Sequence, residues 1–332
     1  MQKIPKIFYP KIRMYKKGFT YLIVTTVIVV VLLSIFFTTS RYKYQDQESL
    51  QQVRIRAMND FMKNLNSDMH RATYISTFRA LLALEDHVAM TGEYLTDMNA
   101  SFREMFFYGD IINGTTSEIM ANSTFSDYLA KAQSLAIASG IVLHMNVIQI
   151  RLMQSDPWDI DVYILMNISA VDTKNTASWN MDKEYVTSVP ISNLRDPLYS
   201  RNTNNKVPNT IRQLSSTILV NGSNTSELQE LISGSYYIAS NLSPNFIMRF
   251  QGLTGNDSNG IESIVNVADL ADQGIVEYDD RVKVDYIYFN NLASDKICNV
   301  TSIPSNMHFV IPSNRKNLYQ IGNLTYSNST CP

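Results

Sequence analysis

The stretch that decides the fold lies near the N-terminus, where residues 16–37 read KKGFTYLIVTTVIVVVLLSIFF. The part from Phe19 to Phe37 is nineteen residues long and carries no charge. At a rise of about 1.5 Å per residue, a helix of this length extends about 29 Å, which matches the hydrocarbon core of a bilayer. The run is too long for the apolar region of a secretory signal peptide, and no small-x-small cleavage site follows it. We therefore expect residues 19–38 to form a transmembrane helix with membrane lipid as its surroundings.

The charges on the two sides of this segment predict its orientation. Residues 1–18 contain no Asp or Glu and six cations: Lys3, Lys6, Lys11, Arg13, Lys16 and Lys17. The positive-inside rule assigns this basic leader to the cytoplasm. Removing these six from the 28 Lys and Arg leaves 22 against 30 Asp and Glu, a net charge of about −8. We expect this acidic remainder to lie outside the cell, and its charge argues against a nucleic-acid partner.

The junction Lys16-Lys17-Gly18-Phe19-Thr20, followed by an apolar helix, resembles the class III signal of type IV pilins. The resemblance implies that a prepilin-type peptidase cuts between Gly18 and Phe19 on the cytoplasmic face. It also implies that the new N-terminal helix anchors the subunit and later packs against like subunits in a filament. Many bacterial pilins carry Glu at the fifth position after the cut, where this chain has Ile23, so filament assembly is in question while processing is not. A plain basic flank of a membrane anchor is the alternative interpretation.

Beyond the membrane segment the helical pattern continues. Apolar residues recur at spacings of three and four: Leu50, Val53, Ala57, Phe61, Leu65, Met69 and Ala72. This pattern predicts an amphipathic stalk helix over residues 39–90, ended by Gly92. In pilin-like subunits such a helix packs on a β-rich head. A dimerising coil would explain the same stripe, although strict heptads are not sustained.

The remainder predicts an α+β fold: a long N-terminal transmembrane and amphipathic helix, then an extracellular head. In residues 91–204 we expect helices and three strands, which follow one another as an antiparallel meander. The predicted helices are 95–107 and 126–138, the latter capped by Ser123 or Thr124, and the predicted strands are 143–153, 160–170 and 185–191. The polar tract 201–206 marks a boundary, and residues 205–332 are expected to form a second α+β lobe. Its predicted elements are a turn at 221–225, a helix at 226–232 and a strand at 282–289.

Several segments along the chain resemble a group of archaeal membrane-anchored surface proteins that has no assigned activity. These segments are Ser155–Asp161, Thr176–Asn180, Asp196–Tyr199, Asn259–Val265 and Val284–Phe289. Archaea combine prepilin peptidases with glycosylation at Asn-x-Ser/Thr. The resemblance therefore implies a compartment and an architecture, and no reaction.

Glycosylation sequons are enriched on the expected outer side. The candidates are Asn99, Asn113, Asn122, Asn167, Asn221, Asn224, Asn256, Asn299, Asn323 and Asn328, with a weaker one at Asn241, where Pro244 follows the Ser. The two cysteines, Cys298 and Cys331, are a candidate disulfide in an oxidising exterior, with a pair of buried free thiols as the alternative. The spacing of the cysteines and histidines does not fit a zinc site.

Catalytic motifs are sparse. The four histidines are scattered, and the loop Asn256–Gly260 is predicted to be a tight turn and not a calcium loop, because Gly255 stands where the first carboxylate belongs. One enzyme hypothesis stays open: a type II membrane-anchored glycosyltransferase that holds a divalent ion with Asp159 and Asp161. The position of this pair argues against the hypothesis. In such enzymes the two Asp residues lie at the end of a strand in a parallel sheet, whereas here they lie at the start of a strand in an antiparallel meander. We expect no catalytic residues, no metal and no cofactor.

The sequence thus predicts a pilin-like, single-pass surface glycoprotein that acts as a structural or interaction subunit, in adhesion or a filament, without catalysis. An anchored extracellular binding module is a further alternative. A receptor that signals across the membrane would need a partner subunit, because eighteen cytoplasmic residues contain no effector domain.

Overall fold

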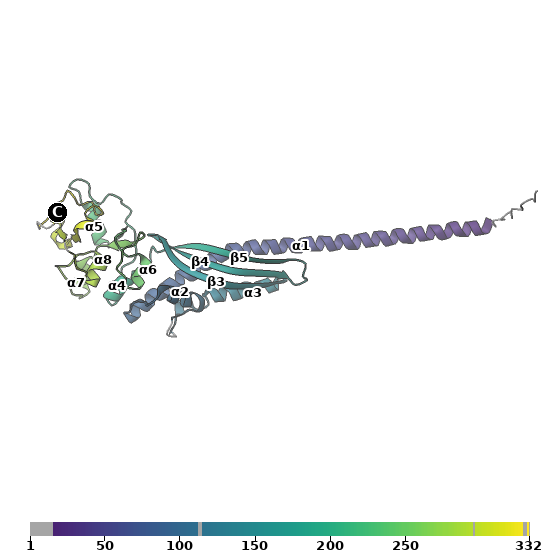
Figure 1. The fold of residues 1–332 in the computed structure, drawn as a ribbon, viewed down its shortest axis with the longest axis horizontal. Coiled ribbons are helices and arrows are strands. Elements are labelled where there is room, and N and C mark those ends of the chain that lie inside the picture. Colours follow the sequence, from purple (N-terminus) through teal and green to yellow (C-terminus); the bar gives the residue numbers. More distant parts are fainter. Residues whose placement is uncertain (1–15, 112–114, 295, 328–330, 332) are drawn as a thin grey trace, which may run out of the picture.

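A computed structural model describes residues 16–111, 115–294, 296–327 and 331. Its longest element is α1 (Lys16–Thr91), a single helix of 76 residues that projects from the rest of the molecule as a rod (Figure 1). The helix ends directly before Gly92, whose left-handed φ of +68° and N–H bond to the Val88 carbonyl (2.9 Å) close the last turn. The predicted continuation of the apolar segment into one long helix is confirmed. Within the predicted apolar stripe Leu65 and Met69 are buried, whereas Val53 and Ala57 are exposed.

A three-stranded antiparallel sheet lies along the second half of α1 (Figure 1). Its strands are β3 (Ile141–Asp156), β4 (Asp159–Asp172) and β5 (Ser178–Pro190), paired in chain order. This confirms the predicted meander. The central strand places six fully buried apolar side chains on one face: Ile160, Val162, Ile164, Met166, Ile168 and Ala170. Of the three strands, β5 packs most closely against α1, and α3 (Phe125–Ala138) packs against β3.

A bulge in β3 keeps the edge strand in phase with this core. Val147 pairs with Met166, whereas Gln149 pairs with Leu165, so Ile148 is the extra residue and is largely exposed. The apolar positions of β3 change from odd to even numbers across it, from Leu143 on one side to Leu152 on the other. Without the bulge one half of the strand would turn its apolar side chains to solvent.

Local side-chain caps define where the two helices begin that follow α1 in the chain and precede the sheet. α2 (Met98–Tyr108) starts three residues later than predicted, because the Asp97 carboxylate accepts the Ala100 N–H (3.1 Å). α3 starts after Thr124, one of the two predicted caps, which forms a capping box with Asp127. Between these helices lie β1 (Asp110–Ile111), β2 (Thr115–Thr116) and the 3-10 helix η1 (Glu118–Met120).

The part of the molecule farthest from the free end of α1 is built from short elements (Figure 1). They are α4 (Pro197–Asn202), α5 (Ser226–Ser233), β6 (Tyr237–Ala239), α6 (Phe246–Phe250), β7 (Ile261–Ser263), α7 (Val267–Asp272), α8 (Asp285–Asn290), β8 (Ile297–Asn299), η2 (Ser305–Met307), β9 (Val310–Pro312) and η3 (Ser313–Arg315). β6 pairs with β7 and β8 pairs with β9, both antiparallel. The helix predicted at 226–232 corresponds to α5.

The strand predicted over residues 282–289 is wrong, because residues 285–290 form helix α8. Every residue from Val282 to Tyr288 is buried, so the alternation of residue types does not correspond to one buried and one exposed face. A short apolar run that is buried on all sides does not distinguish a strand from a helix.

The buried apolar residues form two large clusters and a small one. The first extends from Met58 on α1 to Ile261, and the second from Leu198 to Leu324. Residues 198–261 thus contribute to both. The described part of the chain has a mixed α+β fold.

Candidate functional site

The apolar segment of α1 is long enough to cross a membrane and packs on nothing else in the described chain. It extends over 24 residues, Gly18–Arg41, none of which is buried. Its hydroxyl groups bond to the preceding turn of the helix: Thr25 to Tyr21 O, Thr26 to Leu22 O, Ser34 to Val30 O, Thr38 to Ser34 O and Thr39 to Ile35 O. Such bonds satisfy hydroxyl groups within the helix itself, as a membrane-spanning segment requires.

The predicted processing residues lie at the start of this segment. Gly18 is the third residue of α1 and Phe19 follows it, and both are exposed. A Cβ atom at position 18 would meet no atom within 4 Å, and the backbone there is an ordinary helix. Neither packing nor conformation therefore requires glycine at this position, where it costs about 1 kcal/mol relative to alanine.

The predicted glycosylation sites lie on the surface wherever the structure describes them. Asn99, Asn122, Asn221, Asn224, Asn256, Asn299 and Asn323 are exposed, as is the weaker candidate Asn241, and Asn167 is half-buried on the outer face of β4. The Asn167 amide donates to Asn180 (3.2 Å) and Asp182 (2.7 Å) on β5. Asn113 and Asn328 lie outside the described residues.

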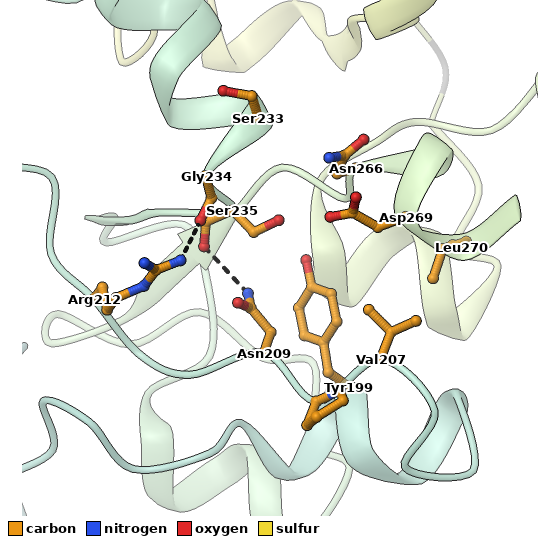
Figure 2. Close-up of a pocket in the computed structure, with 11 residues that line it drawn as sticks. Tyr199, Val207, Asn209, Arg212, Ser233, Gly234, Ser235, Asn266, Asp269 and Leu270 are labelled. Atoms are coloured by element: carbon orange, nitrogen blue, oxygen red, sulfur yellow. Dashed lines mark hydrogen bonds between the residues drawn. The ribbon is translucent and has the colours of Figure 1, made fainter. Parts of the chain in front are cut away.

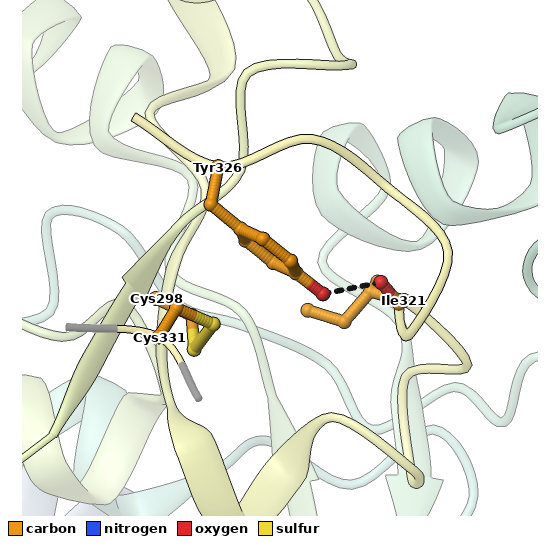
Figure 3. Close-up of a disulfide and its surroundings, with 4 residues drawn as sticks. All are labelled: Cys298, Ile321, Tyr326 and Cys331. Atoms are coloured by element: carbon orange, nitrogen blue, oxygen red, sulfur yellow. Dashed lines mark hydrogen bonds between the residues drawn. A yellow bond between two sulfur atoms is a disulfide. The ribbon is translucent and has the colours of Figure 1, made fainter. Parts of the chain in front are cut away.

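Cys298 and Cys331 form a disulfide (Figure 3). Cys298 is fully buried in β8, so the bond fixes the C-terminal segment to the β8–β9 hairpin. Tyr326 lies beside it and donates its hydroxyl to the Ile321 carbonyl. The structure therefore contains the bonded pair and not the alternative of two free thiols.

Asp159 and Asp161 open β4, but they do not form an open ion site. Asp161 is 9 % exposed, and its two carboxylate oxygens accept the hydroxyls of Ser155 and Ser188 on the flanking strands. Burial and the neighbouring acidic groups Asp156 and Asp161 raise the pKa of Asp159. Among the described residues no group of three His, Cys, Asp or Glu side chains is arranged to hold a metal. The loop Asn256–Gly260 is a tight turn as predicted, closed by the Gly260 N–H on Asp257 O (3.0 Å).

A small polar cavity lies among α4, α5 and α7 (Figure 2). Its volume of about 190 Å³ is below the range of 300–1,000 Å³ typical of ligand pockets. Its polar groups largely bond to the protein itself: Arg212 to Gly234 O (2.8 Å), Asn209 to Ser235 O (3.2 Å) and Tyr199 to the Ser263 hydroxyl (2.9 Å). The arrangement stabilises the loops around it and supplies no nucleophile with an adjacent base.

A buried ion network was not predicted from the sequence. Nη1 of Arg249, on α6, donates to Asp196 Oδ2 (2.6 Å) at the start of α4 and to Asp285 Oδ2 (2.9 Å) at the start of α8. All three side chains are fully buried, and burial raises the pKa of Asp196. Its members are distant in sequence and carry no motif, so only the folded chain reveals it. The network joins elements and does not line a cleft.

Comparison of the chain with protein-family models, with curated proteins and with solved structures finds no match. The assignment of function therefore depends on the residues and their arrangement.

Proposed function

We propose that this chain is a pilin-like, single-pass cell-surface glycoprotein, with a cytoplasmic N-terminus and an extracellular head, that acts as a structural or interaction subunit without catalytic activity. One observation carries the proposal: α1 runs without a break from the uncovered apolar segment into the core of the head. Because the helix is continuous, it fixes the position of the head relative to the apolar segment. Such an architecture suits a subunit that presents a folded body at a fixed distance from a membrane.

The apolar segment needs a cover that the described chain does not provide. Side chains such as Phe19, Leu32 and Phe36 each expose more than half of their surface. Burial of one such side chain contributes about 1.5–3 kcal/mol, so exposure of the whole segment to water is strongly unfavourable. Membrane lipid is the expected cover, and the corresponding helices of like subunits are the second partner.

Three features support the outward orientation of the head. The six cations of the leader favour the cytoplasm, by the positive-inside rule. The Cys298–Cys331 disulfide suits an oxidising exterior. Apart from the half-buried Asn167, the described sequon asparagines are exposed, which suits modification by a glycosyltransferase.

The Gly18–Phe19 junction supports processing by a prepilin-type peptidase. Glycine is unfavourable within a helix, and packing does not require it at position 18. Recognition by a peptidase gives a reason for its presence, and a weak first turn is easily unwound into an active site. Ile23 supplies no carboxylate for the N-terminal amine of a neighbour, so the proposal includes anchoring and processing and treats a filament as a separate question.

The surroundings of Asp159 and Asp161 support the proposed lack of catalysis. The Asp159-x-Asp161 pair is embedded in an antiparallel hairpin with Asp161 engaged by hydroxyls, which favours a structural role over a nucleotide-sugar site. Manganese-dependent binding of a nucleotide sugar to the purified protein would contradict this part of the proposal.

The decisive experiment is N-terminal peptide and intact-mass analysis of the native protein extracted from membranes. We expect a chain that begins at Phe19, and a Gly18→Val variant that keeps its leader. Thr38→Val, at the far end of the same apolar segment, is the matched control and should be processed normally. A wild-type chain that retains residues 1–18 would refute the pilin-like assignment. Protection of the head from protease added to intact cells would refute the orientation.

A further inference from the structure

We infer that Asn224 is, among the sequons that the structure describes, the one that is prearranged to accept a glycan, from a donor of the lipid-linked, phosphate-activated oligosaccharide class. The inference rests on the proposed function, because the donor is available only if the head lies outside the cytoplasm. It goes further by selecting one acceptor among many candidates. The selection comes from hydrogen-bond geometry, which differs between sequons of identical motif.

Asn224 belongs to an ordered, exposed turn. The backbone N–H and C=O groups of Asn221 and Asn224 bond to each other in both directions at 3.0 Å. The Asn224 side-chain oxygen accepts the backbone N–H of Ser226 at 3.0 Å. Ser226 is the hydroxyl residue of the same Asn-Thr-Ser sequon and the first residue of α5, and it is exposed like Asn224. The Asn224 side chain is therefore held against the backbone of Ser226 on the surface.

In other sequons of the described chain, the backbone N–H of the third residue, the Ser or Thr, donates to a different acceptor. It donates from Ser101 to Asp97 O (3.0 Å), from Thr124 to Asp127 Oδ2 (3.1 Å), from Ser243 to Ser240 O (3.2 Å), from Thr301 to Thr325 O (2.9 Å) and from Thr325 to Ser302 Oγ (2.9 Å). At Asn167 the side-chain nitrogen Nδ2, to which a glycan would be attached, itself donates hydrogen bonds to Asn180 and Asp182. Among the described sequons, the bond from the third residue back to the asparagine occurs at Asn224.

This bond favours the chemistry of glycan transfer. The bond to Oδ1 fixes the side-chain torsions of Asn224 and leaves its nitrogen Nδ2 for the donor, which reduces the ordering cost of binding. It also polarises the amide and makes the Nδ2 proton easier to remove. In the transfer, a bond forms between Nδ2 and C1 of the first sugar, and the bond between C1 and the phosphate oxygen breaks. The phosphate leaves with the electron pair, the amide proton passes to a base of the transferase, and nothing is oxidised.

Asn221 is a matched control that the chain itself provides. It is three residues away in the same turn, it is equally exposed, and it heads its own Asn-Gly-Ser sequon. No hydrogen bond from Ser223 to its side chain is present in this described turn. If accessibility alone decided occupancy, the two sites would be modified alike.

The test is glycopeptide mass spectrometry on the native, membrane-extracted protein. Trypsin releases residues 213–249 as one peptide, within which fragmentation locates the glycan. We expect the glycan on Asn224 and little or none on Asn221. The Asn224→Gln and Ser226→Ala variants should lose that glycan mass, whereas Asn221→Gln and Ser226→Thr should keep it.

Equal occupancy of the two sites, or a glycan on Asn221 in place of Asn224, would overturn the inference. The wild-type measurement decides the matter even if a variant fails to fold. One outcome would overturn this inference and leave the proposed function standing. In that outcome the protein begins at Phe19 and is cut by external protease, but it carries no glycan at Asn224. A protease-protected head without glycan at any sequon would remove the proposed function as well.

Discussion

Arg249 connects two helices in the distal part of the molecule. Its guanidinium group is fully buried and holds Asp196 and Asp285, which start two different helices. Removal of the cation leaves two buried carboxylates without their partner, which typically costs 3–5 kcal/mol. We expect Arg249→Met to lower the free energy of unfolding by about that amount in urea titrations. Arg151→Met is the control, because Arg151 is half-exposed in its pair with Glu184 and should change stability by about 1 kcal/mol or less. Equal effects of the two substitutions would contradict the assignment.

Glu85 gives the molecule a pH dependence of unusual sign. Its carboxyl group is 1 % exposed, it accepts the Arg195 backbone N–H (3.1 Å), and its other oxygen has no partner among the described residues. Burial raises the pKa of Glu85 from its ordinary value of 4.5 to about 8, against the lowering effect of the Arg195 contacts. Between these two pH values the folded chain binds more protons than the unfolded chain, so stability falls as pH rises.

The Glu85→Gln variant removes this titration. We expect the wild type to lose up to about 1.4 kcal/mol of stability per pH unit within the window, relative to the variant. Urea unfolding at pH 5, 7 and 9 measures the difference. Glu184→Gln, at a half-exposed carboxylate, should leave the slope unchanged. Parallel curves for the wild type and Glu85→Gln would show that Glu85 titrates normally.

At the scale of elements, the disulfide fixes the C-terminal segment to the β8–β9 hairpin. It joins positions 33 residues apart, and closing a loop of that size in the unfolded chain corresponds to about 3–4 kcal/mol. We expect Cys298→Ser together with Cys331→Ser to lower the unfolding free energy by up to this amount, and mild reduction of the wild type to have the same effect. Calorimetry with and without reductant measures it. If reductant also destabilises the double variant, the effect does not come from this bond.

The elements that the sequence predicts well are those with a long, regular pattern. The helix predicted from the apolar spacing of residues 50–72 continues to Thr91, and the strict alternation from Ile160 to Ala170 corresponds to a strand with one buried face. Each pattern lies within a single element and indicates the type of that element without contacts from distant residues. The bulge at Ile148 was also visible in principle, as a change of apolar phase within one strand.

The elements that the sequence does not predict depend on contacts between distant residues. Asp285 starts a helix where an alternating strand was expected, since its carboxylate accepts the Ser263 N–H (3.0 Å) and pairs with Arg249. The hydrogen bond that distinguishes Asn224 from Asn221 likewise requires the turn to be formed. The positions of sequons and of the Gly18–Phe19 junction are readable from the sequence, whereas the differences among chemically identical motifs are not.

At the scale of the whole molecule, one helix contains an exposed apolar segment, which is the proposed anchor, then a spacer and then a part of the core. Arg41 ends the apolar segment, and Met58 is the first buried apolar residue among those whose side chains the structure describes. A rise of 1.5 Å per residue separates Arg41 from Met58 by about 25 Å. Arg54 on this rod pairs with Asp172 of the head (3.3 Å). The head is thus held clear of the anchor, and its core does not include the apolar segment.

This separation predicts that the head folds without its anchor. A chain that begins at Gln51 keeps Arg54 and the buried residues of α1 while it loses the exposed apolar segment. We expect it to be soluble without detergent and to unfold within about 4 °C of the full chain in detergent, since a change of 1 kcal/mol shifts Tm of such a domain by about 2–4 °C. Circular dichroism on heating provides the measurement. A second truncation that begins at Asn66 removes the buried Met58 and Leu65 and should lower Tm sharply, as the matched control. Aggregation or early melting of the Gln51 chain would mean that the apolar segment contributes to the fold of the head, and the division into anchor, spacer and core would be wrong.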